Sequence, residues 1–244
     1  MLRKLFIFDL DDTLIDSSDV YWSARSNFVQ ELAKRGLDPE EITEVFEEVD
    51  AANMRTMGFA PERYGTSMIG TAQRLLKRNS ISVSEDLLAQ IKHSGEMILT
   101  TWPKPIAGAK ELLDWSAERF DLALVTRGDD DLQRKKLKQA GMTHYFRRIE
   151  VVPSKSCETF AHVMKGSGHS PEDVWVIGDS IRTDINPGIE AGASCILYEY
   201  HHHSYHWRQE HGDQAVGHFY RAKHLGQVPG IISRFGSHIQ TLTI

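Results

Sequence analysis

The sequence predicts an α/β protein in which helices cover both faces of a mainly parallel sheet, with an all-helical segment inserted near the start of the chain. Three observations predict this class. A short apolar run opens the chain, only helical patterns occupy residues 16–100, and short apolar runs alternate with helical patterns from residue 101 onward. Such alternation is typical of parallel sheets, because parallel neighbours need a crossover connection that is usually a helix.

Composition excludes several classes of protein. The chain has 244 residues, of which 41% are hydrophobic and 25% are charged, so it can bury a substantial core. Its formal net charge is -6, and the scattered Lys and Arg residues argue against a nucleic-acid or membrane partner and favour a small substrate. The two distant cysteines, Cys157 and Cys195, suit a reducing compartment, and no signal peptide or membrane-length run is visible. We therefore expect a cytoplasmic protein; its oligomeric state stays open.

The first predicted strand covers residues 4–8 (Lys-Leu-Phe-Ile-Phe) and ends in an acidic stretch that contains Asp9, Asp11 and Asp12. In an open parallel sheet, ligands bind at the carboxyl ends of the strands, which is where these acids lie. Carboxylates so close together need a cation or a shared proton to offset their repulsion. We expect the cation.

The inserted segment predicts four helices. Each begins with a capping residue or a proline at the first turn, and each carries apolar residues at helical spacing. They are expected at about residues 16–36, 38–57, 61–76 and 84–98. The prolines at 103 and 105 mark a stiff linker, so we expect a core made of residues 1–15 and 101–244 and a helical cap made of residues 16–100.

The second half of the chain predicts the remaining strands and the helices between them. Apolar runs predict strands at 122–126, 149–152, 174–177 and 195–198. Helical patterns are expected at 109–119, at 130–141, after Lys155 and near Ile185. Because strand 4–8 has no partner among the helices that follow it, it belongs with these later strands in one sheet.

Polar residues end or follow these strands at the same edge of the sheet: Thr126 ends its strand, Lys155 and Asp179 follow theirs, and Asp184 comes slightly later. The motifs Asp9-Leu10-Asp11-Asp12-Thr13 and Gly178-Asp179-Ser180-Ile181-Arg182-Thr183-Asp184 together resemble those of the haloacid dehalogenase-like hydrolase superfamily, in its phosphatase branch with a helical cap inserted after the first motif. The resemblance covers nearly the whole chain. It implies a Rossmann-like three-layer core, an all-helical cap domain and a Mg2+-dependent phosphatase that acts on a small phosphorylated metabolite.

The resemblance also implies a role for each residue. Asp9 would be the nucleophile that forms an aspartyl-phosphate. Asp11 would be the general acid and then the general base, and the negative charge around it is expected to keep it protonated. Asp9, Asp179 and the backbone carbonyl of Asp11 would bind Mg2+. Thr126 and Lys155 would hold the phosphoryl group.

Two further residues have weaker assignments. Asp184 would hold either the metal-bound waters or Lys155 in place without contacting the substrate. Arg127 is less usual for the family at its position, and it would contact an anionic group of the substrate. A solvated loop arginine is the competing interpretation for Arg127. A capping acid is the competing interpretation for Asp184.

Other interpretations stay open for the remaining assignments. Thr126 can be an ordinary strand residue, and Lys155 can be a surface lysine because its flanking serines and the missing proline depart from the usual family pattern. Lys135, Lys136 and Lys138 are weaker substitutes for Lys155, since they lie within a predicted helix. The histidine-rich stretch 201–211 is expected to form a loop at the substrate entrance, and less plausibly a metal site.

Asp11 favours phosphate esters over haloacids, because the dehalogenases of this superfamily lack an acid two residues after the nucleophile. A phosphomutase on the same fold is the enzymatic alternative. A non-catalytic module that binds a phosphorylated metabolite, with a regulatory role, is the alternative from another class. The physiological substrate and the residues of the cap that select it are not determined by the sequence.

Overall fold

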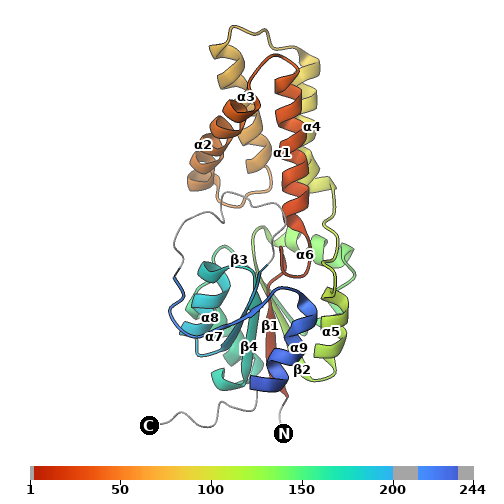
Figure 1. The fold of residues 1–244 in the computed structure, drawn as a ribbon, viewed down its shortest axis with the longest axis vertical. Coiled ribbons are helices and arrows are strands. Elements are labelled where there is room, and N and C mark those ends of the chain that lie inside the picture. Colours follow the sequence, from red (N-terminus) through yellow and green to blue (C-terminus); the bar gives the residue numbers. More distant parts are fainter. Residues whose placement is uncertain (1–2, 200–213, 236–244) are drawn as a thin grey trace. The chain divides into compact units, whose positions relative to one another are not determined.

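The computed structural model describes residues 3–199 and 214–235, so the histidine-rich stretch 201–211 lies outside the described residues. The chain forms two compact units. One consists of Met1–Ser17 and Pro103–Ile244, and the other is Ser18–Trp102. Figure 1 shows a sheet with helices around it in the first unit and only helices in the second.

Six parallel strands form the sheet of the first unit, in the order β3-β2-β1-β4-β5-β6. They are β1 (Lys4–Phe8), β2 (Phe120–Arg127), β3 (Arg148–Val152), β4 (Val174–Gly178), β5 (Ser194–Tyr198) and β6 (Tyr220–Ala222). The first strand of the chain therefore lies in the middle of the sheet, hydrogen-bonded to β2 on one side and to β4 on the other. This arrangement brings the carboxyl ends of β1, β2 and β4 together at one edge.

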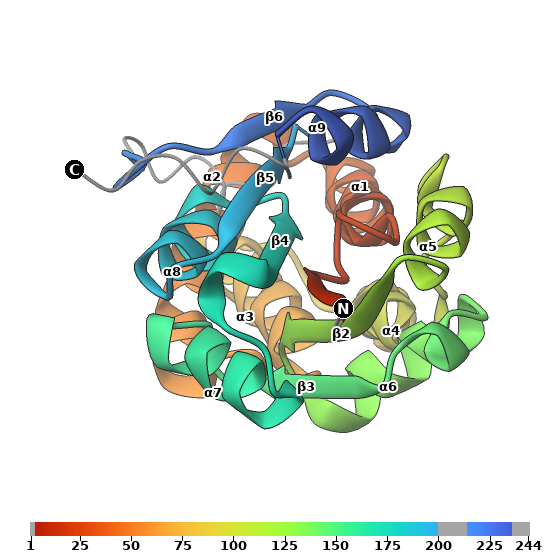
Figure 2. The same cartoon turned by 90° about the horizontal axis from the view of Figure 1, so that it is seen from below.

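Helices cover both faces of the sheet, as Figure 2 shows. One face packs against α5 (Ala109–Ala117), α6 (Asp130–Gln139) and α9 (Val228–Phe235). The other face packs against α7 (Cys157–Ser167) and α8 (Asn186–Glu190). The predicted α/β class is thus confirmed, and its physical basis is that parallel strands bury both of their faces.

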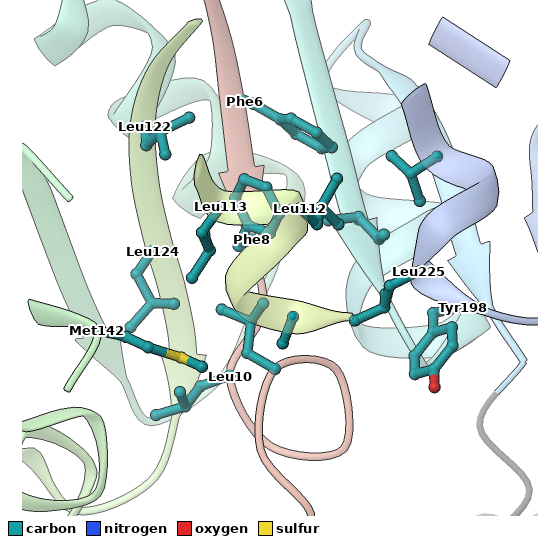
Figure 3. Close-up of a cluster of buried hydrophobic side chains, with 14 of the residues drawn as sticks. Phe6, Phe8, Leu10, Leu112, Leu113, Leu122, Leu124, Met142, Tyr198 and Leu225 are labelled. Atoms are coloured by element: carbon teal, nitrogen blue, oxygen red, sulfur yellow. The ribbon is translucent and has the colours of Figure 1, made fainter. Parts of the chain in front are cut away.

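The side chains of β1 show how one strand serves two cores. Phe6 and Phe8 point into the cluster under α5 and α9, with their ring centroids 4.2 Å apart, and Figure 3 shows them packed among leucines of α5 and β2. Leu5 and Ile7 point into the cluster under α7. Because side chains alternate along a strand, both sets are fully buried, and the strand reads as a continuous apolar run.

The second unit contains α1 (Ser17–Ala33) except for Ser17, which belongs to the first unit, together with α2 (Pro39–Met57), α3 (Arg63–Arg78) and α4 (Glu85–Thr100). Aromatic rings form the centre of its core: the ring centroid of Phe46 lies 5.8 Å from that of Phe28 and 5.1 Å from that of Tyr64. The predicted cap of α2 is present, since the side chain of Asp38 accepts a hydrogen bond from the backbone N–H of Glu40. This unit agrees with the four helices predicted from the sequence.

One strand and one α-helix of the described residues were not predicted. Strand β6 contains only three residues, too few for a recognisable apolar run, and α9 follows it directly after a short 3-10 turn. Both complete the core, because Ala222, Val228 and Ile232 pack into the same cluster as the phenylalanines of β1. Among the described residues, no helix has the length and apolar character needed to cross a membrane.

Candidate active site

The candidate site begins where β1 ends. The backbone N–H of Asp9 donates to the carbonyl oxygen of Ile177 at 2.9 Å, which fixes Asp9 against the neighbouring strand β4. The chain then turns tightly, with a hydrogen bond from the N–H of Leu14 to the carbonyl of Leu10 at 2.9 Å. Asp12 occupies the turn with a φ of 59°, a left-handed conformation that aspartate tolerates better than most residues. The turn keeps Asp11 at the sheet edge beside Asp9.

A buried lysine joins two of the predicted acids. Lys155 lies between β3 and α7, and its Nζ donates to Oδ1 of Asp184 at 2.6 Å and to Oδ1 of Asp9. All three residues are buried, with exposed fractions of 7% or less. Thr13 adds a hydroxyl hydrogen bond to Oδ2 of Asp9 at 3.3 Å. The structure therefore brings Asp9, Lys155 and Asp184 into one ion-paired group.

Asp184 reaches this group because Gly178 has no side chain. A Cβ at position 178 would lie 2.3 Å from the carboxyl carbon of Asp184, so any larger residue would displace that carboxylate. The backbone N–H of Ser180 donates to Oδ2 of Asp184 at 3.2 Å. The glycine that ends β4 and the turn after it thus hold the buried acid in place.

The electrostatic environment makes Asp9 hard to ionise, even with Lys155 beside it. Burial is the largest effect on its pKa, opposed by the charge of Lys155 and reinforced by that of Asp184, and the balance raises the pKa of Asp9 to about 7. Burial lowers the pKa of Lys155, but the two carboxylates outweigh it and raise that pKa above its ordinary value. Lys155 is therefore a permanent cation, and a further positive charge would favour the carboxylate form of Asp9.

Three carboxylates can hold such a cation. One oxygen from each of Asp9, Asp179 and Asp184 lies within 4.8 Å of the others. Carboxylate oxygens are the ligands that Mg2+ prefers, and a divalent charge would offset the excess of acids here. This donor set fits the predicted Mg2+. Asp184 lies close enough to the two predicted carboxylate ligands, Asp9 and Asp179, to offer a third ligand oxygen.

Asp11 has different neighbours from those expected. Lys136 Nζ donates to its Oδ1 at 2.9 Å, Gln133 Nε2 donates to its Oδ2 at 2.6 Å, and the hydroxyl of Ser17 donates to Oδ1. Burial raises the pKa of Asp11, but the charge of Lys136 and these hydrogen bonds outweigh burial and lower it below 3.8. The expectation that negative charge keeps Asp11 protonated is therefore wrong, because a buried lysine stands beside it.

Thr126 and Arg127 end β2 at the same edge. Thr126 is buried, and its hydroxyl oxygen accepts a hydrogen bond from Gln133 Nε2 at 2.7 Å, so one amide links Thr126 to Asp11. Partial burial and the charge of Arg182 lower the pKa of Arg127, while the carboxylates of Asp184, Asp9 and Asp179 oppose that shift. Arg127 thus lies within electrostatic range of the candidate metal-binding acids.

Sequence reasoning missed Gln133 and set Lys136 aside. Both lie on the buried face of α6, at the spacing of three and four residues that also places Leu137 and Ala140 in the core. A lysine and a glutamine on the apolar face of a helix are the signal that was available, since buried polar side chains need partners. The partner of Lys136 is Asp11; Lys155 contacts Asp9, as its position after β3 suggested.

Comparisons with known proteins agree with this arrangement. A family model described as haloacid dehalogenase-like hydrolase matches residues 6–198. The chain is 23% identical over 203 residues to a glyceraldehyde 3-phosphate phosphatase of Pyrococcus furiosus, covering 81% of each chain. It is 26% identical over 209 residues to a pyrimidine 5'-nucleotidase of Streptococcus pneumoniae, covering 83% of this chain and 86% of that protein.

Solved structures share the fold. A haloacid dehalogenase-like family hydrolase from Xanthomonas campestris is similar with a TM-score of 0.79 and 26% identity, covering 96% of this chain and 92% of that one. An L-2-haloacid dehalogenase from Xanthobacter autotrophicus is similar with a TM-score of 0.63 and 17% identity, covering 98% of this chain and 100% of that one. The second likeness concerns the fold alone.

Proposed function

Because this chain belongs to the haloacid dehalogenase-like hydrolase family, we propose that it is a Mg2+-dependent phosphatase that hydrolyses a small phosphate monoester through an aspartyl-phosphate. The observation that carries the proposal is the convergence of Asp9, Asp11, Thr126 and Lys155 at the carboxyl edge of one sheet, with Asp9 paired to Lys155. The phosphatase and nucleotidase relatives support a phosphorylated metabolite as the substrate.

In the first step, an oxygen of Asp9 attacks phosphorus in line with the ester bond, and the new O–P bond forms as the bond to the leaving oxygen breaks. Lys155 and the hydroxyl of Thr126 donate hydrogen bonds to the phosphoryl oxygens, which carry more charge as the transfer proceeds. Asp9, Asp179 and the backbone carbonyl of Asp11 would hold Mg2+, which would supply charge neutralisation for the phosphoryl group. The carboxylate of Asp184 keeps Lys155 aimed at Asp9.

Asp11 moves the proton in both steps. As general acid it gives a proton to the leaving oxygen, and as general base it then takes one from the water that attacks the aspartyl-phosphate, which releases phosphate and restores Asp9. Lys136 and the hydrogen bonds lower the pKa of Asp11 in the substrate-free protein, so Asp11 must gain a proton before the leaving oxygen departs in the first step. The resting carboxylate already has the protonation state that the second step needs.

Asp11 favours a phosphatase over a dehalogenase in spite of the shared fold, because a halide leaves carbon without a proton and needs no acid at this position. A phosphomutase would use the same residues and pass the phosphoryl group to a sugar instead of water. A binding module would need neither a nucleophile nor an acid, whereas this chain has both carboxylates beside cationic partners.

The test is turnover of p-nitrophenyl phosphate and a panel of natural phosphate monoesters by the wild-type protein and Asp9→Asn, each with Mg2+ and with EDTA. Release of phosphate that requires both Asp9 and Mg2+ is expected. Asp173→Asn, at an exposed position of the same unit, is the matched control and should keep wild-type activity.

Three other results would redirect the assignment. Chloride release from 2-chloropropionate without phosphatase activity would indicate a dehalogenase. Activity that depends on an added sugar bisphosphate would indicate a mutase. Tight binding of a panel member without any turnover, unchanged in Asp9→Asn, would indicate a binding module and refute the proposed hydrolysis.

A further inference from the structure

Helix α6 presents two buried polar side chains to Asp11. Gln133 and Lys136 have exposed fractions of 3% and 5%. Burying a lysine this deeply costs free energy unless an acid balances its charge and its N–H groups are hydrogen-bonded. The geometry meets that need at Asp11, 125 residues earlier in the chain.

The two side chains bind different oxygens of the same carboxylate. Lys136 Nζ lies 2.9 Å from Oδ1 of Asp11, and Gln133 Nε2 lies 2.6 Å from Oδ2. Ser17 adds a second donor to Oδ1, and with donors on both oxygens the carboxylate cannot rotate about its terminal bond without breaking at least one hydrogen bond. The orientation of Asp11 is therefore set by α6 as well as by its own turn.

Gln133 also fixes the distance between Asp11 and the end of β2. Its Nε2 lies 2.7 Å from Oγ1 of Thr126, so both hydrogens of the one amide nitrogen are directed at the site. Gly128 leaves room for this side chain, because a Cβ at that position would lie 3.1 Å from Cγ of Gln133. Thr126 and Asp11 are thereby held at a constant separation.

Helix α6 is a rigid support for these contacts. Leu137 and Ala140 lie in the core on the same face, and the side chain of Asp129 caps the first turn by accepting from the N–H of Leu132 at 2.9 Å. A side chain mounted on a packed helix keeps its position better than one on a loop. Helix α6 thus gives Asp11, in the turn after β1, a second rigid support.

We propose that Lys136 and Gln133 are positioning residues that aim the Asp11 carboxyl group at the leaving oxygen of the substrate, in register with the phosphoryl group held at Thr126. This inference rests on the proposed function, since it requires Asp11 to be the general acid. A misplacement of about 1 Å in such a group can cost about 100-fold in rate, so the positioning residues should matter most when the leaving group needs a proton.

The leaving group therefore provides the test. An alkoxide must be protonated as it leaves, whereas p-nitrophenolate leaves as a stable anion. The measurement is kcat/KM, which reports the step that expels the leaving group, for p-nitrophenyl phosphate and for the fastest alkyl phosphate of the panel. The variants are Lys136→Met, Gln133→Met, Asp11→Asn and the double variant Asp11→Asn/Lys136→Met, with Lys135→Met, at an exposed position of the same helix, as the control.

We expect Lys136→Met and Gln133→Met to lower kcat/KM for the alkyl phosphate at least about tenfold more than for p-nitrophenyl phosphate, as Asp11→Asn does, while Lys135→Met changes neither. In the double variant, Lys136→Met should add less than about a twofold loss to Asp11→Asn, because it acts through that carboxylate. Circular dichroism checks that each variant folds. If Lys136→Met does not fold, Gln133→Met still provides the test.

Equal losses for the two substrates in Lys136→Met and Gln133→Met would overturn the proposal, and so would full additivity in the double variant. Failure of the proposed function looks different. In that case Asp11→Asn itself would show no dependence on the leaving group, and the positioning role would fall because Asp11 is not the acid.

Discussion

Lys155→Met should destabilise the metal-free protein strongly, although methionine has nearly the same length and suits a buried position. The substitution leaves the carboxylates of Asp9 and Asp184 buried without the cation that both contact. Removing one partner from a buried ion pair costs about 3–5 kcal/mol. For a protein of this size, each kcal/mol lowers Tm by about 2–4 °C, so a decrease of about 10 °C is expected.

The sign of the pH dependence follows from Asp9. Its pKa is already raised to about 7, and Lys155 is the main influence that lowers it, so the pKa rises further in Lys155→Met. The folded variant then binds a proton that the unfolded chain, with a pKa near 3.8, does not. Stability is lost as the pH rises through the folded pKa, and the decrease in Tm should be larger at pH 8 than at pH 6.

Thermal unfolding in EDTA, followed by circular dichroism at the two pH values, measures this effect. Excess Mg2+ should restore part of the lost stability, because it offsets the same carboxylates. Lys4→Met is the matched control: its ion pair with Asp173 is long, at 3.5 Å, and exposed, so it should cost less than about 1 kcal/mol. A Lys155→Met variant that unfolds in EDTA within about 2 °C of the wild type at pH 8 would refute the argument.

Three other outcomes are expected. The apparent Kd for Mg2+ should rise as the pH falls below about 7, up to about tenfold per pH unit, because a proton on Asp9 competes with the cation; an affinity measured by calorimetry that is constant from pH 6 to 8 would contradict this. Burial raises the pKa of the Cys195 thiol to about 12, so iodoacetamide at pH 8 should label it only after unfolding, and mass spectrometry of the native protein would reveal any exception. In the helical unit, Gly95→Ala would place a Cβ 2.5 Å from Cα of Gly65 and should cost about 1–3 kcal/mol in urea unfolding. Gly70→Ala, whose Cβ would meet a side chain at 3.5 Å, is the control, and equal stability of the two variants would speak against a close helix crossing.

Much of the fold could be predicted because it depends on local patterns. The apolar runs at β1, β2 and β4 are continuous since parallel strands bury both faces, and the capping residues Asp38 and Ser84 start their helices where predicted. Strand β6 could not be predicted. Its three residues have little apolar character of their own, and they form a strand because the edge of β5 offers them hydrogen bonds, with Ile196 opposite Tyr220.

The candidate site divides in a similar way. The sequence alone determined that acids follow β1 and β4, that Thr126 lies at the end of β2 and that a lysine follows β3, because each position is read from a strand and the residues at its carboxyl end. The catalytic roles of these residues remain predictions that the experiments above address. Local pattern also indicated that Asp9 and Asp11 need positive charge nearby.

Only the tertiary structure decided which positive charge each acid receives. Lys155 pairs with Asp9 and Asp184, while Asp11 pairs with Lys136, a lysine that the sequence pattern had set aside because it lies within a helix. This changed the direction of the Asp11 pKa from raised to lowered. The physical reason is that a pKa depends on charges within a few ångströms in space, and the lysines that contact Asp9 and Asp11 lie more than a hundred positions away along the chain.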